Sequence, residues 1–152
     1  MDLEGQPVAL KDFAGRLLLL DFWATWGGPC MNEMPHVVNA YQQFHELGFE
    51  ILGISLDQDL EKLRAYLARE TGVAWRQVCD GQGWKAELAQ RYRVTGIPDT
   101  YLIAPNGKII ARGLRGAALV AELTRQLGAP AGGQAPAGEK PPRTTPSGTK
   151  EP

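Results

Sequence analysis

Residues 17–35 read LLLLDFWATWGGPCMNEMP, and the class of the fold follows from this stretch. Its first part, Leu17–Ala24, is almost continuously apolar, which is typical of a central strand covered on both faces. Gly27, Gly28 and Pro29 end that strand, and the apolar residues that follow recur at the spacing of one helical stripe. The members of the stripe are Met31, Met34, Val38, Tyr41 and Phe44. A strand that turns sharply into a helix predicts an α/β fold.

The alternation of strand and helix patterns continues to residue 127. The further predicted strands are Val8–Leu10, Phe49–Leu56, Trp75–Cys79, Thr100–Ala104 and Lys108–Arg112. The first helix is predicted to end at Gly48, and the further helices are Asp59–Glu70, Trp84–Tyr92 and Ala117–Leu127. This order predicts a central mixed sheet with helices on both faces and an inserted strand–helix segment.

The composition changes abruptly after Gly128. Residues 129–152 contain six prolines and four glycines among 24 residues, with no aromatic side chain and no aliphatic one beyond alanine. Such a segment cannot bury enough apolar surface to offset its ordering entropy. We therefore predict one domain at 1–128 and a disordered Pro/Gly/Ala-rich tail at 129–152.

Charge and cysteine content exclude several classes of function. The 16 Lys and Arg residues are balanced by 17 Asp and Glu residues, which argues against a nucleic acid or a membrane surface as partner. Two cysteines cannot form a disulfide-dense scaffold, nor alone fill a four-ligand zinc site. The first residues, MDLEG, lack the basic and apolar regions of a signal peptide. We therefore expect either a cytoplasmic protein or a mature domain excised from a longer one.

The segment Trp26–Pro35, WGGPCMNEMP, resembles the W-C-x-P-C-x-x-E-x-P motif of the TlpA/ResA-like thiol–disulfide oxidoreductases of the thioredoxin superfamily. The tripeptide at 96–98, GIP, is similar to the loop of this family that carries a cis-proline. The resemblance covers residues 8–127. It implies a thioredoxin-like fold, a monomer without cofactor, and a periplasmic or other extracytoplasmic location. The implied partners are protein thiols and disulfides, for example those of apocytochrome c or another exported protein.

One position departs from the motif, because Gly27 stands where the family carries its first cysteine. In a Cys-x-x-Cys pair the helix N-terminus stabilises the first thiolate, which attacks a substrate disulfide before the second thiol resolves the mixed disulfide. Only the second sulfur, that of Cys30, is present, so we predict that the chain cannot cycle between dithiol and disulfide. Two explanations stay open: an engineered replacement, which the otherwise complete site favours, and a natural glycine in a member that binds without chemistry.

Three further residues take catalytic places in the family's site by resemblance. Asp21 matches a buried carboxylate that accepts the proton of the second thiol, and an Asp in an apolar strand is costly to bury without a purpose. Glu33 lies one helical turn after Cys30 and matches the family's active-site acid, although the helix dipole alone also favours a Glu there. Pro98 is expected in the cis form, facing the cysteine motif.

The residues around the motif are predicted to bind substrate. The backbone of Ile97 would pair with an extended peptide, and Trp26 would form a partly exposed lid beside Gly28 and Pro29. Trp23 is predicted to lie in the core instead.

No metal site is predicted. His36 and His45 have no cysteine or carboxylate partner at ligand spacing, and Asp57–Asp59 lacks the glycine and the distant glutamate of a calcium loop. We interpret that acidic cluster as a helix cap. Cys79 is predicted on an edge strand, too far from Cys30 for a bridge that needs Cα atoms within ~7 Å, so we interpret it as a buried free cysteine.

Three functions follow from these observations. The first is a thiol–disulfide oxidoreductase whose turnover is lost with the first cysteine. The second is a natural non-catalytic module that binds peptides or proteins in the groove between Trp26, Gly27 and Pro98. The third, a peroxiredoxin-like antioxidant enzyme, needs Thr-x-x-Cys, but the residue three positions after Thr25 is Gly28.

Overall fold

The structure is a computed structural model that describes residues 1–69 and 71–130. The strands are β1 (Leu17–Trp23), β2 (Phe49–Ser55), β3 (Arg76–Val78), β4 (Asp99–Ile103) and β5 (Ile109–Arg112). They form one sheet in the order β3-β2-β1-β4-β5. The pairs β1–β2 and β2–β3 are parallel, whereas β4 is antiparallel to both β1 and β5. The predicted mixed sheet is confirmed.

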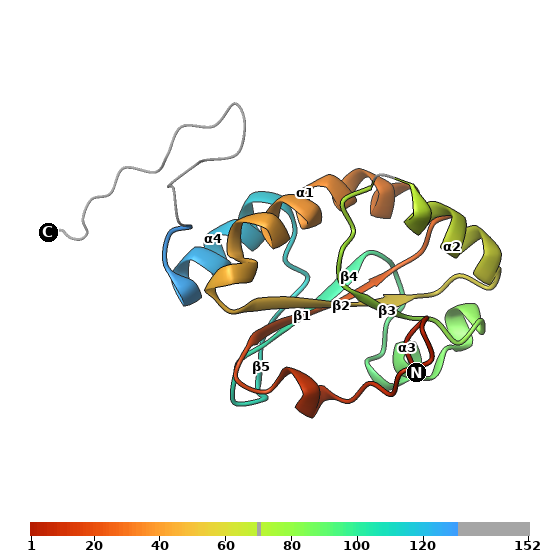
Figure 1. Cartoon of the computed structure of the whole chain (residues 1–152), viewed down its shortest axis with the longest axis horizontal. Helices are drawn as coiled ribbons and strands as arrows, with labels where there is room; N and C mark the ends of the chain where they lie inside the picture. Colours follow the sequence, from red (N-terminus) through yellow and green to blue (C-terminus); the bar gives the residue numbers. More distant parts are fainter. Residues whose placement is uncertain (70, 131–152) are drawn as a thin grey trace, which may run out of the picture.

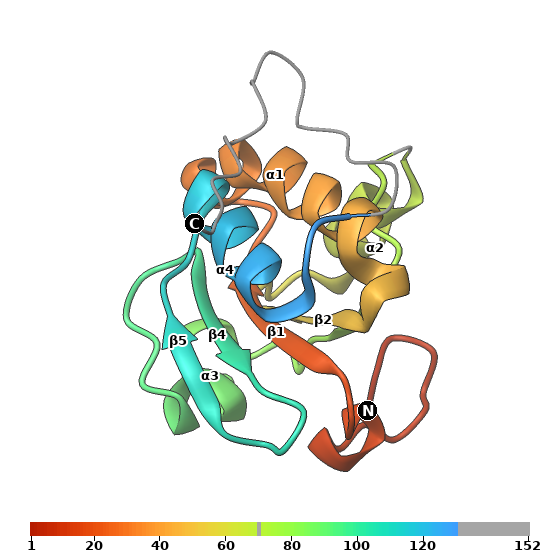
Figure 2. The ribbon, with the colours of Figure 1, turned by 90° about the vertical axis from the view of Figure 1, so that its left-hand side faces the viewer.

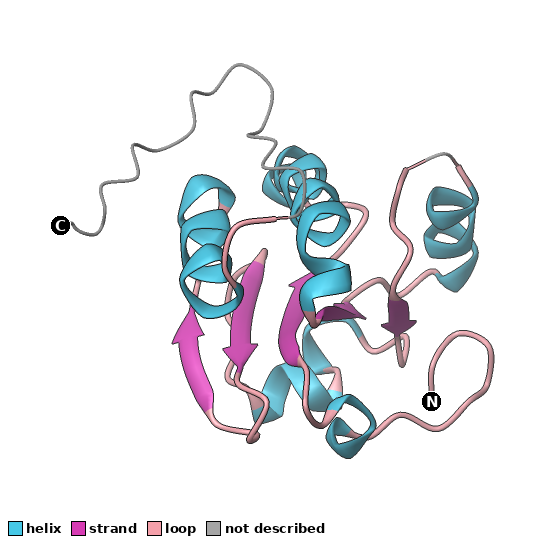
Figure 3. Cartoon of the chain, turned by 60° about the vertical axis from the view of Figure 1, so that its left-hand side comes forward, coloured by secondary structure: helices cyan, strands magenta, loops and turns pink. Residues whose placement is uncertain are grey.

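Helices cover both faces of this sheet (Figure 1). The α-helices are α1 (Gly28–Phe44), α2 (Leu60–Ala68), α3 (Glu87–Arg91) and α4 (Gly116–Leu127). The short 3-10 helices are η1 (Leu10–Phe13), η2 (His45–Leu47) and η3 (Gly83–Lys85). The helices α1, α2 and α4 lie over one face, and α3 and η1 lie over the other, so the strands form the middle layer (Figure 3).

The central strand β1 is buried along its whole length, as its apolar run predicts. Successive side chains of a strand point to opposite faces, so β1 contributes to two cores. Leu17, Leu19 and Trp23 belong to the core beneath α1 and α4. Leu18 and Leu20 belong to the core beneath α3. Because β1 is fixed from both sides, its carboxyl end is a firm support for the loop that follows.

Two predicted elements are wrong in detail. Val8–Leu10 is not a strand: Asp12 accepts a hydrogen bond from the backbone N–H of Ala9 (2.9 Å), which caps the 3-10 turn η1 instead. The predicted helix Trp84–Tyr92 is divided into η3 and α3, because the backbone of Ala86 between them is extended. The remaining predicted strands and helices are confirmed within two or three residues.

The stripe predicted for α1 also needs correction. Its fully buried residues are Cys30, Met34, Val37, Ala40 and Phe44. Met31, Val38 and Tyr41 pack at the margin of the same core. The buried face of α1 therefore includes Cys30, and the sulfur of this residue is part of the packed interior.

The helix α4 ends at Gly128, whose positive φ of 87° suits the predicted C-cap. The predicted tail, apart from Ala129 and Pro130, lies outside the described residues. Among the residues that the structure does describe, no helix is long and apolar enough to cross a bilayer.

Candidate active site

The site lies where the loop after β1 enters α1. Gly27 is the N-cap residue of this helix, and its φ of −86° and ψ of 111° are extended values that any residue adopts. Its N–H donates to the carbonyl of Ala24 (3.2 Å), and its carbonyl accepts from the N–H of Met31 (3.0 Å). The backbone therefore gives no conformational reason for a glycine at position 27.

The sulfur of Cys30 lies directly beside position 27. A Cβ atom on residue 27 would lie 2.9 Å from Sγ of Cys30 and 3.4 Å from its Cβ. Across a disulfide, a Cβ atom is about 3 Å from the far sulfur, and the two Cβ atoms are about 3.5–4.5 Å apart. The spacing of these two positions is thus close to that of a disulfide, with one of the two side chains missing.

The thiol of Cys30 does not ionise readily. Its side chain is buried, and burial raises the pKa of the thiol to about 11, helped by the negative charge of Asp21. A hydrogen bond with the backbone of Ala24 and, to a smaller extent, the positive charge of Arg115 oppose this rise in the pKa only in part. The thiol is therefore neutral at pH 7, as expected for a resolving cysteine rather than an attacking one.

Asp21 is buried in the middle of β1, opposite Gly53 of β2 and Thr100 of β4. It shares a strand face with Leu19 and Trp23, so its side chain points to the side covered by α1. Burial, with a further contribution from the charge of Glu33, raises its pKa to about 7. A carboxyl group with this pKa exchanges protons near neutrality, beside a thiol whose charge it influences.

Glu33 connects two helices. Its Oε2 accepts a hydrogen bond of 2.7 Å from the N–H of Gly116, the first residue of α4. The positive end of that helix favours a carboxylate there. Figure 2 shows α1 and α4 side by side on the same face of the sheet. The structure therefore gives Glu33 a bridging contact to α4, in addition to its electrostatic effect on Asp21.

The loop before β4 faces position 27. The Ile97–Pro98 peptide bond is cis, as expected, and Cδ1 of Ile97 would lie 3.5 Å from a Cβ atom on residue 27. Among the described residues, none is hydrogen bonded to the backbone N–H or carbonyl of Ile97. Nη2 of Arg115 donates to the carbonyl of Pro98 (2.9 Å). This arginine, which the sequence analysis missed because no motif marks it, thus holds the loop in place.

Of the two tryptophans around this loop, one is buried and the other is exposed, as predicted. Trp23 is buried, and its Nε1 donates to Oε1 of Gln77 (2.9 Å). Trp26 is 53% exposed, and Gly28 and Pro29 beside it are exposed too. The groups available to a partner are therefore Trp26 and the first turn of α1.

Asp57 is a second buried carboxylate of the site, and it was interpreted wrongly as part of a helix cap. It accepts hydrogen bonds from the hydroxyl groups of Thr25 and Ser55, both 2.6 Å, and from the backbone N–H of Thr25 (3.1 Å). The thiol of Cys79 donates to its backbone carbonyl (3.1 Å). Only Asp59 is the cap, accepting from two N–H groups of α2. Asp57 thus joins the loop after β1 to the ends of β2 and β3.

Replacing Asp57 is expected to destabilise the domain. Asp57→Ala leaves the hydroxyl of Ser55 and the N–H of Thr25 without their acceptor, at a cost of about 2–4 kcal/mol in the free energy of unfolding. The matched control Asp59→Ala removes an exposed cap and is expected to cost about 1 kcal/mol. Urea unfolding of both variants measures the difference, and equal losses would contradict the joining role of Asp57.

The other polar candidates lie outside this cluster. Cys30 and Cys79 are both free thiols, and Cys79 is half-buried rather than fully buried. His45 has one carboxylate neighbour, since its Nε2 lies 3.4 Å from Oε2 of Glu50. Within residues 1–69 and 71–130 no three metal-ligating side chains come together, and His36 is an exposed residue of α1.

Comparison with known proteins found a matching family and several similar proteins. Residues 1–112 match the AhpC/TSA family. The thiol-disulfide oxidoreductase ResA of Bacillus thuringiensis subsp. konkukian is 33% identical over 109 residues, which are 72% of this chain and 61% of that protein. ResA of Bacillus subtilis is 30% identical over 109 residues, with 72% and 59% covered. The chain thus spans about three fifths of the length of these curated relatives.

Solved structures agree with the fold. The thioredoxin domain of a thiol-disulfide oxidoreductase from Bacteroides vulgatus is 32% identical, with a TM-score of 0.75 over 84% of this chain and 90% of that one. A thiol-disulfide oxidoreductase from Bacteroides fragilis is 35% identical, with a TM-score of 0.70 over 76% and 84%. The thioredoxin-like fold that the resemblance implied is confirmed.

Proposed function

Because the chain belongs to the AhpC/TSA family, among the ResA-like thiol–disulfide oxidoreductases, we propose that its site is built for exchange with protein thiols and disulfides and that Gly27 withholds the attacking sulfur. The chain as it stands then performs no dithiol–disulfide turnover. It engages thiol-bearing segments of proteins without completing the exchange.

One observation carries this proposal, namely the distance of 2.9 Å between a Cβ atom on residue 27 and Sγ of Cys30. This spacing is what remains when the first cysteine of a Cys-x-x-Cys pair is replaced by glycine and the second keeps its place. The extended backbone of Gly27 supports the same reading, because its φ and ψ are values that any residue adopts.

The surrounding residues have roles that fit such an exchange. A thiolate at position 27 would attack one sulfur of a substrate disulfide and release the other. The thiol of Cys30 would then attack the mixed disulfide, lose its proton to Asp21, and release the substrate fully reduced. Its pKa of about 11 keeps Cys30 protonated until that second step, while the pKa of about 7 lets Asp21 accept the proton.

The substrate class follows from the backbone of Ile97. Its N–H and carbonyl bond to no other described residue, and its side chain borders position 27. An extended peptide could pair with these groups as an added strand while its sulfur faces position 27. As the resemblance of its motif implies, the proposal extends to exported proteins as partners, apocytochrome c among them, to an extracytoplasmic location, and to a monomer.

A second candidate function is peptide binding without chemistry. The same groups of Ile97 and the exposed Trp26 favour it, since neither depends on a sulfur atom. A peroxidase is not supported, because Gly28 occupies the place of the cysteine in Thr-x-x-Cys and because burial raises the pKa of the thiol of Cys30 to about 11.

The test compares the chain as it is with a Gly27→Cys variant in the reduction of insulin disulfides by dithiothreitol. Catalysis by the variant alone supports the oxidoreductase site with a withheld sulfur. Binding of reduced, alkylated insulin chains without catalysis by either protein would favour the binding module instead. A chain that already catalyses the reaction with Gly27 in place would overturn the proposal.

A further inference from the structure

Two of the four tryptophans form an exposed pair beside the site. Trp23 and Trp75 are buried, but Trp26 is 53% exposed and Trp84 is 44% exposed. The rings of Trp26 and Trp84 contact each other, with centroids 5.9 Å apart and planes tilted by 56°. Since burying an indole is strongly favourable, two large aromatic side chains left in solvent side by side are typical of an interaction surface.

The segment that carries Trp84 is firmly built. The carboxylate of Asp80 accepts hydrogen bonds from the N–H groups of Gln82 (3.0 Å) and Glu87 (3.1 Å). The side chain of Gln90 donates to the carbonyl of Trp84 (3.0 Å). Three hydrogen bonds thus fix the 3-10 turn η3 while the indole that it carries stays in solvent. The exposure of Trp84 is therefore a property of an ordered turn and not of a loose loop.

The same buried residue positions both members of the pair. Asp57 binds Thr25, the neighbour of Trp26, through its carboxylate. Through its backbone carbonyl it binds the thiol of Cys79, which directly precedes Asp80 at the start of the other loop. The distance between the two indoles is thus set by the interior of the protein. Such preorganisation lowers the entropic cost of binding a partner.

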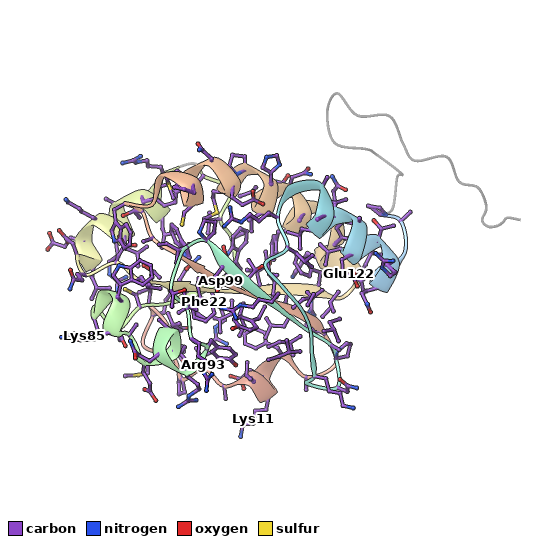
Figure 4. The ribbon with its side chains drawn as sticks, turned by 180° about the vertical axis from the view of Figure 1, so that it is seen from behind. Lys11, Phe22, Lys85, Arg93, Asp99 and Glu122 are labelled. Atoms are coloured by element: carbon purple, nitrogen blue, oxygen red, sulfur yellow. The ribbon has the colours of Figure 1, made fainter. Side chains whose placement is uncertain are left out.

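The charges around the pair indicate what it binds. These charges balance: Asp80 and Glu87 are negative, Arg91 lies 2.8 Å from Glu87, and Lys85 supplies the second positive charge, so neither a cation nor an anion is favoured. Lys85, next to Trp84, extends outward from the molecule and adds a positive charge (Figure 4). The complement of this surface is therefore an apolar or aromatic side chain.

We propose that Trp26 and Trp84 together bind a bulky apolar or aromatic side chain of an extended partner segment, next to the cysteine that this segment presents at position 27. Trp26 directly precedes Gly27, so the aromatic pair continues the peptide surface formed by Ile97. This surface selects among partners by the residues that flank their cysteines. The proposal rests on the proposed function, from which it takes the presence of a cysteine-bearing segment at the site.

The test uses two peptide disulfides, the dimers of Gly-Phe-Gly-Cys-Gly-Phe-Gly and of Gly-Ser-Gly-Cys-Gly-Ser-Gly. In the Gly27→Cys background, the phenylalanine dimer is expected to be reduced with a kcat/KM about tenfold above that of the serine dimer, a ratio that corresponds to about 1.4 kcal/mol. Trp84→Ala is expected to bring this ratio close to one. The matched control Ile109→Ala removes a comparably exposed apolar side chain from the edge strand β5, and the ratio is expected to stay near ten.

A second measurement separates this inference from the proposed function. The chain as it is, with Gly27, is titrated with the phenylalanine peptide carrying serine in place of cysteine, and tryptophan fluorescence reports binding. Trp84→Ala is expected to raise the Kd about tenfold. If the Gly27→Cys variant reduces neither dimer, the proposed function fails. In that case this titration alone tests whether Trp26 and Trp84 bind the peptide. A ratio near ten that survives Trp84→Ala, or a Kd that Trp84→Ala does not change, would overturn the inference.

Discussion

The Gly27→Cys variant is expected to reduce insulin disulfides at least about 100-fold faster than the chain as it is. With a pKa of about 11, the thiol of Cys30 is ionised to roughly one part in 10⁴ at pH 7. A cysteine at the N-cap of α1 would be ionised to a large extent because the positive end of the helix stabilises its thiolate, a gain of about 10⁴ in thiolate. A more acidic thiol is a weaker nucleophile, and this lowers the rate gain by a factor of about 10².

The control for this prediction is Gly27→Ser, which adds a side chain of similar size without a sulfur. Its rate is expected to equal that of dithiothreitol alone, as for the chain with Gly27. Initial rates at pH 7 are compared at equal protein concentration. A serine variant as active as the cysteine variant would show that the effect comes from the shape of the loop and not from the sulfur.

The Asp21→Asn variant is expected to be more stable than the chain as it is by about 2–4 kcal/mol at pH 9 and equally stable at pH 3. Burial raises the pKa of Asp21 from 3.8 to about 7, so the folded protein favours the neutral acid. Below about pH 3.8 the carboxyl group is protonated in both folded and unfolded chains and has no pH-dependent effect. As the pH rises from about 4 to 7, the unfolded chain releases this proton more easily, and stability falls. An amide of the same shape avoids that loss.

Urea unfolding at pH 3, 5, 7 and 9 measures this difference. The matched control Asp59→Asn changes an exposed cap residue, and asparagine caps a helix about as well as aspartate. Its effect on the free energy of unfolding is expected to be small at every pH. An Asp21→Asn effect that does not change with pH would contradict the raised pKa of Asp21.

The fold could be predicted well wherever burial dominates the sequence pattern. The continuous apolar run at 17–24 identified β1 as the central strand, since only a strand covered on both faces tolerates such a run. Val8–Leu10 was predicted wrongly because its short pattern does not reveal that Asp12 accepts a hydrogen bond from the N–H of Ala9 and thereby caps η1. The sequence pattern at 84–92 likewise cannot show that Ala86 is extended and divides the helix.

The site could be predicted only where a motif marks it. Asp21, Cys30 and Pro98 stand in recognisable contexts: in the structure Cys30 and Ile97, the residue before the cis-proline, border position 27, and the charge of Asp21 acts on Cys30. Arg115 and Trp84 reach the site from distant parts of the chain, and their contacts depend on tertiary packing that no local spacing encodes. Asp57 was assigned to the wrong interaction for a related reason, since its partner Thr25 lies 32 residues away.

The central claim is that position 27 is the place of attack in an otherwise complete exchange site, and trapping tests it most directly. A Gly27→Cys, Cys30→Ser variant keeps the attacking thiol but cannot resolve the intermediate. Incubated with the phenylalanine peptide dimer, it is expected to accumulate one mixed disulfide per chain, mapped to residue 27 by mass spectrometry after proteolysis, while the chain with Gly27 stays unmodified. Capture of the peptide at Cys79, or no capture at all, would contradict the account.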